Sequence, residues 1–199
     1  GKTEVLVIDN SQGEEKERIE KACGAYRARY IEGVESVRKK RNLGITLAQY
    51  EYVLFIDSDV EVQAGLLDAH ARGYLDNASN EKLAGTFGLT EFVGKKTIWW
   101  KILELTTFID SFSFAKQFPY VSWTIGNNVS FRREVLLEIG MFEENLPFKL
   151  GGDDLDMTYR VTKAGYCIKT VPEAVTFHSR DTWNSWKAVN DRSKRWGSM

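Results

Sequence analysis

The sequence has few cysteines, and this excludes two common kinds of small-protein scaffold. Cys23 and Cys167 are its only cysteines, and neither belongs to a Cys-x-x-Cys pair. A disulfide framework or a zinc site built from such pairs is therefore not expected. A reducing compartment, such as the cytoplasm, is the simpler prediction.

The sequence also lacks an excess of charge of either sign and any long apolar run. Its 27 basic and 28 acidic side chains give a net charge of −1, without the basic excess that is typical of nucleic-acid-binding proteins. No apolar run reaches the roughly 18 residues of a membrane span, and no signal-peptide pattern is present. A chain of 199 residues, of which 43% are hydrophobic, is expected to form one compact domain over residues 1–199.

Short apolar runs alternate with longer helical patterns through the first half of the chain. Strands are predicted at residues 5–9, 27–32, 52–56 and 82–93, and helices at residues 14–26, 33–49 and 63–75. Strands that alternate with helices of this length indicate βαβ units and a mostly parallel sheet with flanking helices. The sequence therefore predicts an α/β fold, in which ligands bind beyond the carboxyl ends of the strands.

The second half of the chain has a less regular pattern. Residues 98–118 are crowded with aromatic side chains and are predicted to be helical. They are expected either to line the core and an acceptor site or to rest on a membrane. The other expected elements are a strand ending near residue 131, a short helix at residues 132–139, a helix from residue 153 and two short strands at residues 166–171 and 174–177.

Acidic side chains follow the ends of two predicted strands. Asp9 ends the first strand, and Asp57-Ser58-Asp59 comes directly after the apolar strand at residues 52–56. These acids are expected to project toward one edge of the sheet, because the carboxyl ends of parallel strands meet there. Mg²⁺ is usually held by one or two carboxylates together with substrate phosphates. Asp57 and Asp59 therefore fit a metal that arrives with a diphosphate, although two acids on a solvated turn would have the same spacing.

A second acidic group begins a predicted helix. It consists of Asp153, Asp154 and Asp156 behind Gly151-Gly152. Acids in the first turn stabilise a helix by capping and through its dipole, but three acids are more than capping needs. The glycines would permit close approach of a ligand to the backbone. A general base among these acids would have its pKa raised by its acidic neighbours and lowered by the helix dipole, and the sequence does not decide between the two effects.

Two basic features have both a structural and a functional interpretation. Residues 38–41 form a basic run that is either a solvated helix face or a partner for a phosphorylated ligand. His178 follows the apolar run at residues 174–177 and is either a structural residue or a ligand.

Taken together, these motifs resemble those of a known family. The stretches are, in order, VLVIDNSQG, RKKRNLGITLAQYEYVLFIDSDV, GNNVSFRREVLLEIGMFEENL, GGDDLDMTYRVTKAGYCI and PEAVTFH. Their order and spacing across nearly the whole chain resemble the inverting nucleotide-sugar glycosyltransferases of family 2, which have the GT-A fold. The resemblance implies a Rossmann-like domain that moves a sugar from a nucleotide diphosphate sugar to an acceptor hydroxyl with the help of Mg²⁺ or Mn²⁺.

The resemblance also implies roles for individual residues. Asp154 matches the catalytic base, in a motif usually written Glu-Asp, so that Asp153 stands in place of the Glu. The nucleotide-sugar-binding positions implied are Asp9, Arg41 and Asp57, and the metal contacts are Asp59, Asp57 and His178.

Support for the acceptor site is expected from four positions, which are Asp153, Asp156, Gly152 and Trp196. Trp196 closes the stretch Arg192-Ser193-Lys194-Arg195-Trp196, which resembles the Gln-x-x-Arg-Trp motif of processive, membrane-bound polysaccharide synthases. A basic surface helix is the alternative interpretation of this stretch. The partners implied are a UDP-sugar donor, favoured because of Asp9, and a glycan or lipid-linked acceptor at the cytoplasmic face of a membrane.

The chain begins where the second strand of the family would lie, so a fragment or an N-terminal truncation is expected.

Two other function classes are alternatives to a glycosyltransferase. A nucleotidyltransferase would be expected to show a Gly-rich phosphate loop with Lys near its first strand, and none is visible. A non-catalytic sugar- or nucleotide-binding domain is disfavoured because the acids are retained at both motifs.

Overall fold

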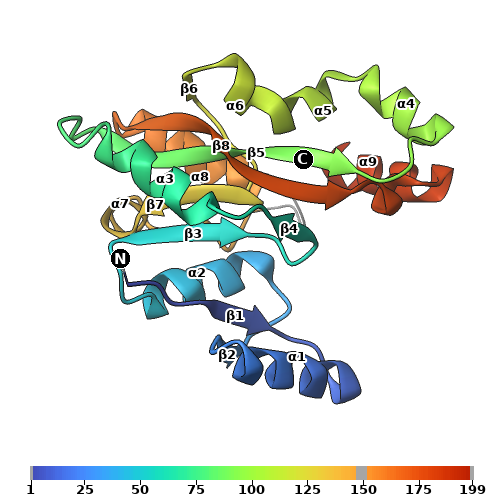
Figure 1. Ribbon diagram of the computed structural model, residues 1–199, viewed down its shortest axis with the longest axis horizontal. Coiled ribbons are helices and arrows are strands. Elements are labelled where there is room, and N and C mark those ends of the chain that lie inside the picture. Colours follow the sequence, from blue (N-terminus) through green and yellow to red (C-terminus); the bar gives the residue numbers. More distant parts are fainter. Residues whose placement is uncertain (1, 147–151, 198–199) are drawn as a thin grey trace.

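The computed structural model describes residues 2–146 and 152–197. Figure 1 shows two sheets, with the smaller one at one end of the molecule. The elements of the first half are β1 (Leu6–Asp9), α1 (Gly13–Ala25), β2 (Arg29–Glu32), α2 (Val37–Leu47), β3 (Tyr52–Ile56), β4 (Val60–Val62), α3 (Leu66–Leu75) and β5 (Leu83–Val93). Those of the second half are α4 (Ile98–Glu104), α5 (Thr107–Asp110), η1 (Ser111–Ser113), α6 (Phe114–Gln117), β6 (Tyr120–Val121), β7 (Asn128–Arg132), α7 (Arg133–Glu138), α8 (Asp153–Lys163), β8 (Cys167–Ser179), η2 (Arg180–Trp183) and α9 (Trp186–Gly197).

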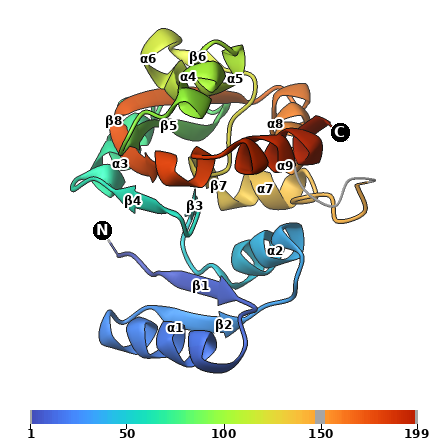
Figure 2. The ribbon, with the colours of Figure 1, turned by 90° about the vertical axis from the view of Figure 1, so that its right-hand side faces the viewer.

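The smaller sheet consists of β1 and β2, which run parallel and are joined by α1. Its last register pair is Asp9 with Glu32, so Asp9 lies at the carboxyl end of β1, as predicted. The chain leaves α1 through Arg27, whose φ of 56° is in the left-handed region that often ends a helix. Figure 2 shows α2 between this unit and the larger sheet.

The larger sheet has the strand order β3-β7-β5-β8-β4, and β6 also pairs with β8. Strand β7 is antiparallel to both β3 and β5, whereas β8 is parallel to β5. The strands β3, β5 and β8 therefore run in the same direction. Their carboxyl ends lie at one edge of the sheet, which can be followed in Figure 1.

The predicted α/β class is confirmed, but the pairing within the larger sheet differs from the mostly parallel prediction. Parallel pairing occurs between β1 and β2 and between β5 and β8. The pairs β3–β7, β5–β7, β4–β8 and β6–β8 are antiparallel. A parallel pair needs a crossover connection, usually a helix laid over the sheet. The segment from α4 to β6 instead carries the chain back along the sheet, and residues 122–127 then return it toward the edge at which β3 and β5 end, so β7 runs antiparallel to both.

The aromatic segment at residues 98–118 is helical in short pieces instead of one helix. Thr97 begins α4 by accepting a hydrogen bond from the Trp100 backbone N–H at 3.3 Å. Hydroxyl groups then bond to nearby carbonyls, from Thr106 to Leu103 at 2.7 Å and from Ser113 to Asp110 at 2.8 Å. Such local bonds compete with the helical ladder, which explains why α4, α5, η1 and α6 are separate.

The two strands predicted at residues 166–171 and 174–177 form one strand, β8, with an irregularity inside it. Against β5, Val171 pairs with Gly88 and Val175 with Leu89, so the intervening residues 172–174 have no partner there. Pro172 lies in this bulge, where its missing N–H breaks no ladder bond. The sequence pattern indicated a break at the proline, whereas the sheet continues past it.

Asn128 of β7 fills the gap that the bulge leaves. Its side-chain amide donates hydrogen bonds to the carbonyl of Leu89 at 3.1 Å and to that of Ala174 at 2.8 Å. Its side-chain oxygen accepts from Nε2 of His70 at 3.0 Å, and Nδ1 of His70 lies 2.8 Å from the Thr86 hydroxyl. The side chains of Asn128, His70 and Thr86 are all buried, so these bonds satisfy polar groups whose burial would otherwise be costly.

The main core lies between the larger sheet and helices on one of its faces. It includes Ile45 from α2 and the buried side chains Phe87, Val129, Phe131, Leu136, Met157, Val161 and Ile168. Helix α3 covers the opposite face, where Ala69 packs against β8. Among the residues that the structure describes, none of the helices is long and apolar enough to cross a bilayer. The packed sheet is a rigid support for the side chains at its edge.

The buried His70 predicts a specific pH dependence of stability. Burial lowers the pKa of His70, so the unfolded chain takes up a proton near pH 6.5 more readily than the folded one. The free energy of unfolding is therefore expected to fall as the pH drops below about 6.5. The decrease should be smaller in the His70→Gln variant, which has no imidazole to protonate.

Urea unfolding of both proteins between about pH 7.5 and about pH 5.5 measures this difference. His178 titrates in both proteins and cancels in the comparison. An equal loss of stability on acidification in the two proteins would contradict the assignment of a neutral His70.

Candidate functional site

Side chains from α2, β3 and α8 meet at the edge where β3 ends. Asp57 follows β3 directly, and the last register pair of β3 with β7 is Ile56 with Asn128. Gly152 begins α8 with a left-handed φ of 72°, which places Asp153 and Asp154 in its first turn. Asp57 therefore meets Asp153 and Asp154 at this edge, whereas the sequence predicted that Asp57 and Asp59 would share an edge with Asp9, which ends a strand of the smaller sheet.

The guanidinium of Arg41 binds three of these carboxylates. Its Nη1 lies 2.7 Å from Asp153 and also contacts Asp154, and its Nη2 lies 3.4 Å from Asp57. Only 13% of the Arg41 side chain is exposed. We call these four residues the Arg41 cluster, and in it a single cation joins α2 to the end of β3 and the start of α8.

Helix α2 is fixed so that Arg41 reaches the acids. The neighbouring residue Asn42 accepts from the backbone N–H of Phe142 and donates to the Phe142 carbonyl, both at 2.9 Å. The ring of Phe142 in turn lies 5.2 Å from the Arg41 guanidinium carbon. Of the adjacent residues Arg41 and Asn42, Asn42 therefore anchors α2, and Arg41 binds the acids.

The electrostatics of the Arg41 cluster are those of crowded, desolvated charges. Burial disfavours the charged form of Arg41, but the carboxylates of Asp154, Asp153 and Asp57 outweigh burial and raise its pKa. Burial also raises the pKa of Asp57, and Arg41 opposes this change. The pKa of Asp153 is raised by burial and by Asp154, again against Arg41. Burial and the neighbouring carboxylates thus make Asp57 and Asp153 harder to ionise, and the positive charge of the guanidinium offsets the repulsion among the carboxylates.

Gly126 belongs to this site, although the sequence suggested no role for it beyond its place at the start of the stretch GNNVSFRREVLLEIGMFEENL. Its backbone N–H donates to Oδ2 of Asp154 at 3.0 Å. A Cβ at this position would lie 2.6 Å from Oδ1 of Asp154 and closer still to the Arg41 guanidinium. The place of Gly126 before Asn127-Asn128 was the available signal, and its meaning depends on a neighbour that lies far away in the sequence.

Asp59 pairs with His178 beside the Arg41 cluster. The register pair Val60 with His178 joins β4 to β8 and brings His178 next to Asp59, with Nε2 3.4 Å from the carboxylate. His178 Nδ1 donates to the Ser179 carbonyl at 2.9 Å. The hydrogen bond between the two side chains lowers the pKa of Asp59 and raises the pKa of His178.

The candidate metal contacts are thus divided between two interactions, with Asp57 on Arg41 and Asp59 on His178. Within residues 2–146 and 152–197, no group of three or more His, Cys, Asp or Glu side chains could hold a metal ion. The side chains of Asp57 and Asp59 are 46% and 50% exposed. Accessible carboxylates of this kind suit an ion such as Mg²⁺ that keeps waters and substrate phosphates as its other ligands.

Asp9 lies at the end of β1 with partners of its own. Its carboxylate accepts from the backbone N–H of Ser11 at 3.0 Å, from the Ser11 hydroxyl at 2.9 Å and from Tyr30 at 3.4 Å. Burial alone would raise its pKa, but these hydrogen bonds outweigh burial and lower it. Asp9 is therefore an ionised acceptor held in a turn, and its bonds go to Ser11 and Tyr30 instead of the Arg41 cluster.

Asp156, one of the predicted support residues, lies away from the Arg41 cluster. Asp156 pairs with Arg160 at 2.7 Å, and Arg160 also donates to the carbonyls of Ile139 and Met141. Asp156 therefore fastens α8 to the chain beyond α7 and is not brought to the site. The side chain of Trp196 lies outside the described residues.

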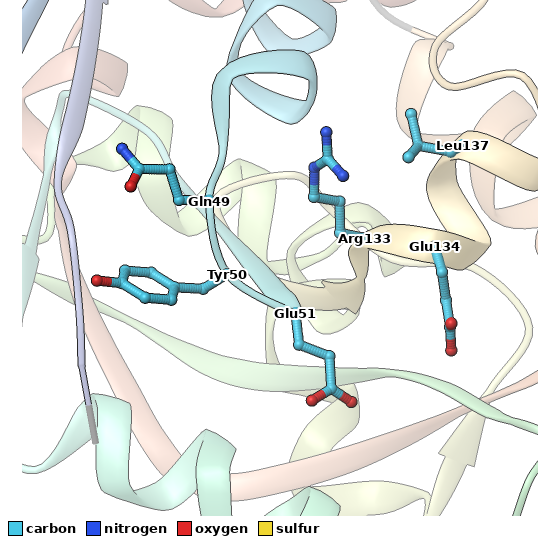
Figure 3. Close-up of a pocket in the computed structure, with 6 residues that line it drawn as sticks. All are labelled: Gln49, Tyr50, Glu51, Arg133, Glu134 and Leu137. Atoms are coloured by element: carbon cyan, nitrogen blue, oxygen red, sulfur yellow. The ribbon is translucent and has the colours of Figure 1, made fainter.

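A separate hollow lies at the opposite end of β3. Figure 3 shows its lining, which consists of Gln49, Tyr50, Glu51, Arg133, Glu134 and Leu137, and its volume is about 300 Å³. Arg133 uses its guanidinium to bond the carbonyls of Ile45 at 2.7 Å and Thr46 at 3.1 Å, at the end of α2. This hollow follows from the way α2 is capped and does not contain the predicted site residues.

Comparison with known proteins gives consistent results. The family model described as glycosyltransferase like family 2 matches residues 3–198. A chondroitin synthase of Escherichia coli is 23% identical over 218 residues, which cover 88% of this chain and 30% of that protein. The chain thus spans about a third of the length of this curated relative.

Two solved structures share the fold. GalNAc-T7, crystallised with UDP, GalNAc and Mn²⁺, gives a TM-score of 0.64 at 16% identity, over 88% of this chain and 37% of that chain. The mannosyltransferase PcManGT from Pyrobaculum calidifontis, in complex with GDP-Man and Mn²⁺, gives a TM-score of 0.61 at 16% identity, over 88% of this chain and 47% of that chain. The predicted GT-A fold is confirmed by this likeness.

The packing around Gly126 predicts the effect of adding one methyl group there. The Gly126→Ala variant is expected to lose about 1–3 kcal/mol of stability, because its Cβ would overlap Asp154 and Arg41. Gly24→Ala is the matched control, since nothing lies within 4 Å of that position on α1, and alanine favours a helix.

Urea unfolding of the two variants and the parent protein measures the difference. In an Arg41→Ala background, the additional cost of Gly126→Ala should become smaller, because one of the two clashing groups is gone. A Gly126→Ala variant as stable as Gly24→Ala would contradict the described packing.

Proposed function

The chain belongs to glycosyltransferase like family 2, and from this membership we propose that it moves a sugar from a nucleotide diphosphate sugar to an acceptor hydroxyl, with inversion at the anomeric carbon. The observation that supports the proposal most directly is the Arg41 cluster, which gathers Asp57, Asp153 and Asp154 at the carboxyl edge of the sheet. Open α/β sheets bind their ligands at this edge.

Asp154 is the proposed general base. It removes the proton of the acceptor hydroxyl while the acceptor oxygen forms its bond to the anomeric carbon and the bond to the diphosphate breaks. Gly126 and Arg41 each hold one oxygen of this carboxylate, so its orientation is set before a substrate arrives. Asp153 shares the same guanidinium and keeps Arg41 in place.

Arg41 is proposed to act on the donor as well as on the base. A guanidinium pairs readily with phosphate oxygens, and a diphosphate near Asp57 would compete with the carboxylates for it. Any weakening of the Arg41–Asp154 contact would free one oxygen of Asp154 to accept the proton of the acceptor hydroxyl. Donor binding and activation of the base would then be linked through one side chain.

Asp57, Asp59 and His178 are the residues proposed to hold a divalent ion. When bound, Mg²⁺ or Mn²⁺ would neutralise charge on the departing diphosphate. The exposed carboxylates of Asp57 and Asp59 support this assignment, and both structural relatives were solved with Mn²⁺ and a nucleotide or nucleotide sugar. A UDP-sugar is the proposed donor and a glycan or lipid-linked saccharide the proposed acceptor.

The role of Asp154 is tested by Asp154→Asn. This variant is expected to lose about 10²- to 10⁴-fold in the rate of sugar transfer, because an amide cannot take the proton. Asp68→Asn is the matched control, since Asp68 is an exposed acid in the first turn of α3 and should transfer at the parental rate. Transfer is measured with a panel of nucleotide sugars and saccharide acceptors. Parental activity in Asp154→Asn would refute the assignment of the base.

The nucleotide and metal sites are tested together by thermal unfolding. UDP with Mn²⁺ at about one hundred times its dissociation constant should stabilise the chain by about 2.7 kcal/mol, or roughly 5–10 °C in Tm. GDP and dTDP should give smaller shifts, and a chelator should remove the metal-dependent part. Asp59→Asn should do the same without a chelator. A shift that survives in Asp59→Asn would place the metal elsewhere, and no shift with any nucleotide would contradict donor binding by this chain.

A further inference from the structure

Helix α4 is apolar on two opposite faces. Its inner face carries Trp100 and Leu103, which are buried. Its outer face carries Ile98, Ile102 and Leu105, which are 62%, 46% and 86% exposed and are spaced i, i+4 and i+7. A surface helix normally has a polar outer face, so a helix apolar on both faces is expected to have a partner on each.

An exposed tryptophan extends this outer face. Trp186 begins α9 and is 61% exposed, and its ring centroid lies 5.7 Å from that of Trp99 on α4. Figure 1 shows α4 and α9 at the same end of the larger sheet. We call Ile98, Ile102, Leu105 and Trp186 the docking face.

The docking face rests on a packed base. Trp100, Leu103, Trp183 and Val189 form a buried cluster between α4, η2 and α9. Arg180 lies 5.1 Å from the Trp100 ring and donates to the Gly94 carbonyl at 2.7 Å. The exposed apolar side chains are therefore held in place by the fold.

The two segments that carry the docking face are rich in positive charge. Residues 94–105 carry three lysines and one glutamate, and residues 180–197 carry five basic and two acidic side chains. The whole chain has a net charge of −1, so this end of the sheet is basic in a protein that is otherwise slightly acidic. Lys95, Lys101 and Lys187 are all exposed.

We propose that the docking face binds the surface of a bilayer that contains anionic lipids. Exposed aliphatic side chains enter the headgroup boundary, tryptophan favours the interface, and lysines are attracted to anionic headgroups. A second copy of the chain is a poorer partner, because contact through the same face would bring like charges together.

The position of the docking face relative to the site suggests what the bilayer would present. His178 lies 5.4 Å from Phe92, and Phe92 lies 4.6 Å from Trp100 on the inner side of α4. The docking face is on the other side of the same helix, so a bound bilayer would lie one helix away from the candidate metal residues. This favours a lipid-linked acceptor over a soluble one, a step that rests on the proposed function.

Sedimentation with vesicles tests the proposal without any sugar donor, so its outcome is separate from the test of transfer. The probe is an equal mixture of phosphatidylcholine and phosphatidylglycerol, compared with pure phosphatidylcholine at low and high salt. The chain should bind the anionic vesicles, bind the neutral ones much less and be released by salt.

Paired variants identify the surface. Ile98→Ser with Leu105→Ser should weaken binding by at least about tenfold, because two inserted side chains are lost. Lys101→Glu with Lys187→Glu should also weaken it about tenfold and reduce its salt dependence. The matched control, Leu67→Ser with Leu75→Ser, removes exposed leucines of α3 and should bind as the parent does. Circular dichroism checks that each variant is folded.

Three results would overturn the proposal. The first is no sedimentation with anionic vesicles, and the second is undiminished binding by the folded Ile98→Ser, Leu105→Ser variant. The third is self-association that this variant abolishes in the absence of vesicle binding, which would assign the face to a second copy of the chain.

Discussion

The contact of Arg41 with three carboxylates is the interaction on which the rest of the site depends. Asp57, Asp153 and Asp154 come from the end of β3 and the start of α8, and without a cation they would repel each other in a poorly solvated place. The guanidinium suits this task because its planar fork of donors can bind several carboxylates at once. Removing it would leave the buried Asp153 and the partly buried Asp154 without their cation, and an unpaired buried charge costs more free energy than the ion pair contributes to stability. The same contact explains why residue 126 has no side chain, since any Cβ there would displace Asp154 or Arg41.

The sequence indicated parts of this site and missed the links between them. A strand ending in acids and a helix beginning with acids are local patterns, and both were predicted. The pairing of Arg41 with residues more than one hundred positions away is a tertiary contact that no periodicity reports. The separation of Asp154 from Asp156, by contrast, is implied by helical geometry, because two residues in a helix turn through about 200°. The spacing of Asp156 and Arg160, four residues apart, also indicates the ion pair that holds Asp156 away from the site.

The sequence predicted the helices and strands that follow from local residue patterns, but not the features that depend on pairing with distant segments. The elements from β1 to α3 follow apolar runs and helical patterns closely, apart from the short strand β4, which exists through its pairing with β8. The direction of β7 depends on how the connection from α4 through β6 to residue 127 turns. The continuity of β8 past Pro172 depends on Asn128, which bonds the carbonyls of Leu89 and Ala174 at the bulge. Both are settled by side chains from other strands and helices, which a single stretch of sequence does not contain.

Asp154 and Arg41 are held more firmly by the protein than the exposed carboxylates of Asp57 and Asp59. Gly126, which bonds Asp154, lies two residues before Asn128, the first residue of β7. The hydrogen bond between Asn128 and His70 fixes the start of β7 and so helps to hold Gly126 against Asp154. Asp154, the proposed base, and its guanidinium partner are therefore held in place before a ligand arrives, as an efficient site requires. The carboxylates of Asp57 and Asp59 are about half exposed and occupied only by Arg41 and His178 among the partners described. An incoming cation with a diphosphate would supply charge where the protein leaves acids accessible and would find the base already oriented. In the proposed reaction, the preformed half of the site would therefore serve the acceptor, and the half that is completed on binding would serve the donor.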